Sequence, residues 1–198
     1  MRKIRISIIL IFVFCIMACG GRGFFAWGEA SWKEEVLLHD GKKIVIERFY
    51  NLGSRPSLDS HEQEDLDETI TFTMPGTNKK IIWKTDFRDE KPEPNGLRLL
   101  VLDIFNGIPY IATYPAGIIA YNKWKRPNPP YIFLKYDGNN WKQIPLEEFP
   151  AEISKVNVIV ARPPAELQKP FYTAEQVNGE NNRGNMDEKY KIIIRTPM

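Results

Sequence analysis

Hydrolytic chemistry requires a nucleophile beside a base, and the chain contains one such pair in sequence, Ser60 next to His61. Adjacent side chains do not by themselves create serine–histidine geometry, and the G-x-S-x-G turn that presents a nucleophilic serine is absent. The other histidine, His39, precedes Asp40 at the rim of an expected hairpin. We therefore interpret both histidines as surface residues and assign no catalytic residue.

Carboxylate pairs could support a different reaction, the hydrolysis of a glycosidic bond by a general acid and a second carboxylate. Glu147 with Glu148, and Asp86 with Asp89, are pairs of this kind in sequence. Their separation in space, which the sequence does not give, decides whether such a pair can act. The sequence also contains no glycine-rich phosphate-binding loop, so we expect no cofactor.

The densest titratable segment covers residues 59–68, with seven acids and histidines in ten positions. Carboxylates can bind a hard cation such as Ca²⁺, but the EF-hand spacing with its central glycine is absent. Runs of like charge usually form solvated loops. We predict an exposed acidic loop here and assign no metal ligand.

A segment that combines aromatic, basic and proline residues is the strongest candidate for ligand binding. It runs from Tyr121 to Tyr131 and contains Trp124, Arg126 and three prolines. Aromatic faces can stack on sugars or peptides, and the basic side chains could bind anionic groups on cell-wall polymers or lipid headgroups. We select Tyr121, Trp124 and Arg126 as candidate ligand-binding residues, with core packing as the alternative for the aromatic side chains.

The first 18 residues have the three parts of a secretory signal. Arg2, Lys3 and Arg5 precede an apolar run from Ile6 to Met17, and small residues follow it. This run is shorter than the roughly 20 apolar residues that a membrane-spanning helix needs. We therefore expect residues 1–18 to be a signal peptide.

The residues around Cys19 resemble a bacterial lipoprotein signal, in which an aliphatic residue, a tolerant position and a small residue precede a cysteine. Ile16, Met17 and Ala18 occupy these positions, whereas Cys15 has the bulky Phe14 before it. The resemblance implies that Cys19 carries a diacylglyceryl group, that the leader is cut before Cys19, and that the new amine takes an acyl chain such as palmitate. Cleavage of an unlipidated secreted protein and an uncleaved anchor remain alternatives.

Removal of the leader would change the charge of the chain. The full sequence has 198 residues, 27 Lys and Arg, 25 Asp and Glu, and a formal charge of +2. The leader contains three of the cations and no acid, which leaves 24 cations against 25 acids and a charge of −1. No basic field then remains to suggest a nucleic acid partner. With Cys15 removed and Cys19 acylated, thiol catalysis and disulfides are excluded as well.

Turn residues divide the middle of the chain into successive hairpins. The expected strand pairs are 32–38 with 43–50, 69–74 with 80–85, 97–105 with 108–114, and 131–136 with 141–144. Asn106-Gly107 is the clearest of the turns, because both residues tolerate positive φ. The run 99–102 does not alternate, so we expect a central strand covered on both faces.

The last third of the chain is less regular. We expect a helical turn at 146–149, strands at 156–161 and 190–195, and a short helix capped by Thr173 and Gln176. About ten strands with little helix predict an all-β fold of antiparallel hairpins, arranged as a sandwich, a barrel or a propeller-like array. We expect a tether at 19–30 followed by a single β-rich domain at 31–198.

Four segments resemble a family of uncharacterised proteobacterial lipoprotein-like proteins: WKEEV at 32–36, HDGKKIVIER at 39–48, YNKW at 121–124 and RPNPPY at 126–131. The resemblance implies an envelope location and no particular activity. Because Gly20 is not the Asp that retains lipoproteins in the inner membrane, the lipoprotein rule implies the outer membrane. We expect a lipid-anchored, non-enzymatic binding or structural domain that faces the periplasm. Its partners would be the membrane and an envelope protein or cell-wall polymer, and the alternative is a periplasmic hydrolase that acts on glycan or peptide through carboxylates.

Overall fold

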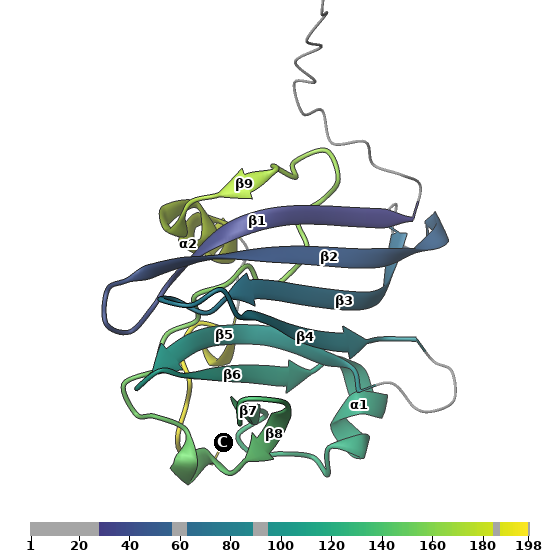
Figure 1. The fold of residues 1–198 in the computed structure, drawn as a ribbon. Helices are drawn as coiled ribbons and strands as arrows, with labels where there is room; N and C mark the ends of the chain where they lie inside the picture. The colour runs from purple at the N-terminus through teal and green to yellow at the C-terminus, as the bar shows by residue number, and fades with distance from the viewer. Residues whose placement is uncertain (1–27, 57–62, 89–94, 184–186, 198) are drawn as a thin grey trace, which may run out of the picture.

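A computed structural model describes residues 28–56, 63–88, 95–183 and 187–197. Within these residues the chain forms two β-sheets packed in a sandwich-like arrangement (Figure 1). The first sheet has the order β4-β3-β2-β1-β9 and the second the order β5-β6-β7-β8. The strands are β1 (Glu29–Leu37), β2 (Lys43–Pro56), β3 (Gln63–Thr73), β4 (Lys80–Asp86), β5 (Leu97–Phe105), β6 (Ile108–Pro115), β7 (Ile132–Tyr136), β8 (Trp141–Ile144) and β9 (Phe171–Tyr172). The predicted all-β class is confirmed, and the sandwich is the correct alternative.

All four predicted hairpins are present as antiparallel pairs: β1 with β2, β3 with β4, β5 with β6, and β7 with β8. The sequence Asn106-Gly107 correctly predicted the turn between β5 and β6. Asn106 has φ 50° and Gly107 has φ 74°, and a two-residue type I′ hairpin turn requires positive φ at both positions.

The alternation of buried and exposed residues in the first sheet creates its inner face. In β1, for example, Trp32, Glu34 and Val36 are buried while their neighbours are more exposed. This face packs on the second sheet to form the main core, which includes Val36, Ile46, Ile70, Trp83, Leu99, Leu102, Ile111 and Ile132. Period-two patterning and burial of apolar area therefore explain the contact between the sheets.

The opposite face of the second sheet is covered by the C-terminal part of the chain. Leu100, Val101 and Phe133 form a second core with Phe149 and Ile193. Strand β5 is therefore covered on both faces, as expected, but it lies at the edge of its sheet rather than at the centre. The prediction of a central strand is wrong because burial of both faces does not require a strand neighbour on each side.

Two predicted strands in the last third are not strands. Residues 156–161 form a largely buried irregular segment, and residues 190–195 follow the short 3-10 helix η2 (Glu188–Tyr190) with one isolated bridge, Lys155 to Ile192. Their apolar content reflects packing on the second sheet, which does not require a strand. The 3-10 helix η1 (Leu146–Glu148) confirms the predicted turn near residue 146.

Two helices complete the described fold, α1 (Gly117–Lys123) and α2 (Ala174–Arg183). The predicted cap of α2 is confirmed, because the Thr173 N–H donates to Gln176 Oε1 at 3.0 Å and the Gln176 N–H donates to Thr173 Oγ1 at 3.4 Å. Helix α1 was not predicted. Neither helix has the length and apolar composition needed to cross a membrane. The leader and Cys19 lie outside the described residues.

Candidate functional site

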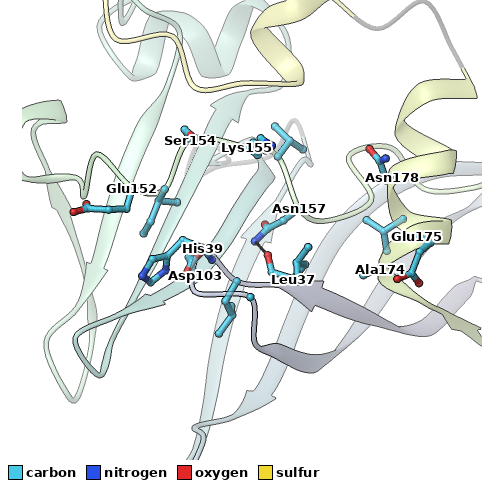
Figure 2. Close-up of a pocket in the computed structure, with 15 residues that line it drawn as sticks. Leu37, His39, Asp103, Glu152, Ser154, Lys155, Asn157, Ala174, Glu175 and Asn178 are labelled. Atoms are coloured by element: carbon cyan, nitrogen blue, oxygen red, sulfur yellow. Dashed lines mark hydrogen bonds and ion pairs between the residues drawn. The ribbon is translucent and has the colours of Figure 1, made fainter.

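A cavity of about 590 Å³ lies at one end of the sandwich, and we call it the His39 pocket. Its walls come from the β1–β2 turn, from Asp103 of β5, from residues 152–157 and from the first turns of α2 (Figure 2). Four segments that are far apart in sequence therefore form one concave surface. Sequence analysis did not identify it, because none of the four segments contains a motif for ligand binding or catalysis.

His39 and Asp103 form the most closely connected polar pair in this pocket. His39 Nδ1 lies 2.7 Å from Asp103 Oδ1, and the His39 backbone N–H donates to Asp103 Oδ2 at 2.8 Å. The His39 side chain is 18% exposed and that of Asp103 is 3% exposed. A carboxylate only accepts hydrogen bonds, so Nδ1 carries the proton in this pair and Nε2 is the second polar atom of the ring. The residue as a whole is exposed, as predicted, but its ring is partly covered in the pocket wall.

Local sequence explains how the two residues meet. Gly41 has φ 83° and closes the β1–β2 turn through its N–H bond to Leu38 O at 3.0 Å, which holds His39 at the tip. Asp103 is the single acid in strand 97–105, where Arg98 is the only other charged residue. Phe105 packs against the His39 ring with their centroids 5.3 Å apart. A lone acid inside this largely apolar strand was the sequence signal that could have identified this site.

Asn157 forms part of the pocket wall and connects it to both sheets. Its Nδ2 donates to Leu37 O at 3.0 Å and to Leu102 O at 2.9 Å, and its Oδ1 accepts from the Leu102 N–H at 3.1 Å. The amide thus takes the place of a neighbouring strand at the edge of β5. This side chain positions the pocket wall and has its hydrogen-bonding atoms occupied.

The start of α2 provides a charged rim. Glu35 accepts from the Ala174 N–H at 3.1 Å, and Lys43 contacts Glu35 at 2.9 Å and Glu175 at 3.3 Å. The backbone N–H of Glu175, with Thr173 and Lys43, holds the pKa of the Glu175 carboxyl below its ordinary value. The acids that contact Lys43 here thus face hydrogen-bond donors and a cation, conditions that favour the ionised form.

The pocket does not assemble a serine hydrolase triad around His39. Ser154 lies on the wall across from His39 (Figure 2), and no hydrogen bond among the described residues joins the two side chains. The predicted carboxylate pairs also lie elsewhere, since Glu147 and Glu148 are exposed on η1 and Asp89 is outside the described residues. Among the described residues, neither Ser154 nor a predicted carboxylate pair is therefore hydrogen-bonded to His39.

The predicted ligand-binding residues lie at and just beyond α1. Trp124 is half-buried against the main core, and its indole N–H donates to Asn95 O at 2.7 Å. Tyr121 is half-buried and Arg126 is exposed, with Arg126 Nε donating to Asn122 Oδ1 at 2.8 Å. The three residues lie within six positions of the chain, and none lines the His39 pocket. Trp124 has a structural role, whereas the ligand-binding role of the three residues stays a prediction.

The acidic segment was predicted to be a solvated loop, and from Gln63 onward this is wrong. These residues belong to β3, and three of the acids face arginines: Asp65 contacts Arg98 at 3.0 Å and Arg162 at 2.7 Å, Asp67 contacts Arg88 at 3.2 Å, and Glu68 contacts Arg48. Residues 59–62 lie outside the described part. In the part that is described, no group of three or more acids, histidines or cysteines is arranged to hold a metal ion.

A buried polar layer, which we call the Arg48 cluster, consists of Trp32, Glu34, Arg48, Tyr50 and Glu68. Arg48 Nε donates to Glu68 Oε1 at 2.6 Å and Arg48 Nη2 donates to Tyr50 Oη at 2.7 Å. Glu34 accepts from Trp32 Nε1 at 2.7 Å and lies 3.4 Å from Arg48 Nη1. All five side chains are sealed from solvent, so the cluster is a structural element and not a ligand site.

Comparison with known proteins adds no assignment to this geometry. No family model matches the chain, and no curated protein or solved structure is significantly similar to it. The resemblance to a lipoprotein-like family therefore stays a prediction. The candidate site is therefore assigned from the geometry of the His39 pocket alone.

Proposed function

We propose that this protein is a binding domain of the bacterial envelope, held to the outer membrane by acyl chains on Cys19 and facing the periplasm. The observation that carries the binding role is the His39 pocket, a cavity of about 590 Å³ with a histidine–aspartate pair in its wall. Ligand pockets of this size typically combine apolar walls with a few fixed polar groups. The leader and Cys19 support the anchor through their sequence pattern.

The lining of the pocket favours a ligand with both polar and apolar faces. Leu38, Ile153 and Val177 provide apolar surface, while His39 and Asn178 provide polar groups. Sugars and short peptides have this mixture of hydroxyl, amide and hydrocarbon surface. We therefore propose that the ligand is a glycan–peptide fragment of the cell wall.

Disaccharide–peptide fragments released from purified peptidoglycan provide the direct probe. We expect saturable binding by calorimetry and shifts of the His39 imidazole signals in NMR spectra. His39→Gln should weaken binding about tenfold or more, because a lost polar contact in a buried site commonly costs 1–3 kcal/mol. Lys42→Ala is the matched control, since Lys42 is exposed in the same turn and does not line the pocket. Absence of binding, or equal affinity for His39→Gln, would refute the proposed ligand site.

The His39–Asp103 pair also supports one alternative, a hydrolase in which His39 acts as a general base on water. Mass spectrometry of the fragments after incubation separates the two functions. Intact fragments support binding, and time-dependent cleavage that His39→Gln abolishes would establish the hydrolase instead.

The anchor is tested separately, on protein purified from membranes. We expect a mature chain that begins at Cys19 and carries the mass of its acyl groups. An unmodified N-terminus after residue 19 would contradict the anchor without affecting the pocket.

A further inference from the structure

Helix α1 and the residues after it form an unusual surface on this domain, which we call the α1 surface: Ile118, Ile119, Lys123, Lys125 and Arg126. Ile118 is 73% exposed and Ile119 is 46% exposed, although isoleucine is usually buried. The three cations are exposed as well. The surface thus presents apolar and basic side chains together to solvent.

The charge of this segment differs in sign from that of the whole domain. Residues 116–130 contain three cations and no acid, whereas the chain without its leader has one more acid than it has cations. Lys125 and Arg126 also have φ values of 60° and 52°, which residues other than glycine rarely adopt. The fold thus concentrates positive charge beside exposed isoleucines at one place.

The α1 surface lies at the end of the sandwich where the N-terminal chain enters. In the first sheet, Glu29, Asn51, Asp67 and Asp86 are paired in one row across β1 to β4. From Asp86 the connection continues through Gly96, whose N–H donates to Asp86 O at 2.9 Å and whose carbonyl accepts from the Ala116 N–H at 2.6 Å. Ala116 directly precedes α1, so Glu29 and α1 share one end (Figure 1).

The His39 pocket lies at the other end of the strands. His39 follows the last residue of β1, Leu37, whereas Glu29 begins that strand. Nine residues from Cys19 reach at most about 30 Å when fully extended. A membrane anchor at Cys19 therefore keeps the α1 end within reach of the bilayer.

We propose that the α1 surface docks on a bilayer that contains anionic phospholipid, so that the His39 pocket points away from the membrane. This proposal rests on the anchor at Cys19. Lysine and arginine would contact headgroup phosphates, and Ile118 and Ile119 would enter the interfacial region, the combination that membrane-surface helices use. The lipid chains keep the domain at the surface, and the α1 surface sets its orientation.

The test uses the acylated mature chain in vesicles, with an environment-sensitive nitrobenzoxadiazole label on a single cysteine. Ile119→Cys places the label on the α1 surface, and Ile192→Cys is the matched control, because both isoleucines are 46% exposed. Ile192 pairs with Lys155, which lines the His39 pocket. We expect blue-shifted emission and quenching by nitroxide lipids for residue 119 in phosphatidylglycerol vesicles, but not in phosphatidylcholine vesicles or at high salt. The label at residue 192 should report water throughout.

A charge variant separates docking from simple proximity. Lys125→Asn with Arg126→Asn removes two cations, and asparagine tolerates the left-handed backbone better than most residues. The ratio of docked to undocked protein should fall about fivefold for each cation removed, as expected for about 1 kcal/mol per charge near an anionic surface. Lys33→Gln with Lys84→Gln removes two exposed cations from the outer face of the first sheet and should leave the ratio unchanged.

Two outcomes would overturn the proposal in distinguishable ways. An acylated chain whose residue 119 reports water in phosphatidylglycerol vesicles would refute the α1 surface while leaving the anchor intact. A chain whose mass shows an unmodified Cys19 would refute the anchor and the orientation that depends on it.

Discussion

Arg48 is completely buried and is enclosed by two carboxylates, two aromatic rings and a backbone carbonyl. Its guanidinium carbon lies 5.0 Å from the ring centre of Trp32 and 5.7 Å from that of Tyr50, and Nη1 also donates to Ile159 O. Loss of one partner from such an arrangement leaves the opposite charges buried without compensation. Arg48 therefore determines whether Glu34 and Glu68 can remain in the core.

We predict that Arg48→Met lowers the free energy of unfolding by about 3–5 kcal/mol at neutral pH, the range typical for breaking a buried ion pair. Chemical denaturation gives this quantity directly. Arg183→Met is the control, because Arg183 contacts Glu180 at 2.9 Å but its side chain is 57% exposed. The control should change stability by less than about 1 kcal/mol. Equal effects of the two substitutions would contradict the structural role of the Arg48 cluster.

Glu34 gives a prediction on pH. Burial raises the pKa of its carboxyl above the ordinary value of 4.5, and this effect exceeds the opposite influence of Arg48. The folded protein then holds this proton more tightly than the unfolded chain does. The contribution of Glu34 to stability is therefore fully present below pH 4.5 and decreases as pH rises toward the folded pKa.

Unfolding measurements on wild type and Glu34→Gln across this range isolate the effect. The stability of wild type relative to the variant should decline as pH increases from 4.5. Glu47→Gln, on the exposed outer face of β2, controls for the removal of a negative charge. A relative stability that rises with pH would mean that folding lowers the pKa of Glu34.

Among the elements, α1 depends on a close approach at Gly96. A Cβ at residue 96 would lie 2.6 Å from the Ala120 Cβ, and Gly96 has φ 55°. We predict that Gly96→Ala costs about 3 kcal/mol, through overpacking and the left-handed backbone together. Gly76→Ala has a similar φ of 73° with nothing within 4 Å, so it should cost only about 1 kcal/mol. Thermal unfolding compares the two substitutions.

The elements differ in how well the sequence predicted them, for physical reasons. Hairpins such as the one at Asn106-Gly107 were predictable because the turn chemistry and the strand alternation are both local. The segment 156–161 was predicted to be a strand because it is apolar, but its hydrogen bonds include those of the Asn157 amide to β5. Burial by tertiary packing gives the same composition as a strand, so composition could not separate the two.

The candidate site was less predictable than the fold. His39 and Asp103 are 64 positions apart, and no local sequence rule predicts that they meet. The acidic run was misread for a similar reason, since Arg48, Arg98 and Arg162, which neutralise it, come from distant elements. Charge that looks solvated in sequence becomes structural when the topology supplies a partner.

For the whole molecule, the C-terminal segment is the last layer of the core. Ile193 is buried against the second sheet, and Arg195 Nη2 donates to Pro150 O at 2.6 Å. Tyr131 Oη also donates to Lys189 O, at 2.7 Å. The two sheets also share the main core. The first sheet packs on the second sheet, and the second sheet packs on the C-terminal segment. We therefore expect the described residues to unfold in one cooperative transition, as a single domain should.

Two adjacent isoleucines test this expectation. Ile193 is 6% exposed, so Ile193→Ala should lower the free energy of unfolding by about 2–4 kcal/mol through lost burial and a new cavity. Ile192 is 46% exposed, and Ile192→Ala should change it by less than about 0.5 kcal/mol. Far-ultraviolet circular dichroism and tryptophan fluorescence should shift to lower denaturant together in Ile193→Ala. Because Trp83 lies in the first sheet, a shift confined to circular dichroism would mean that the C-terminal layer unfolds independently of the sandwich.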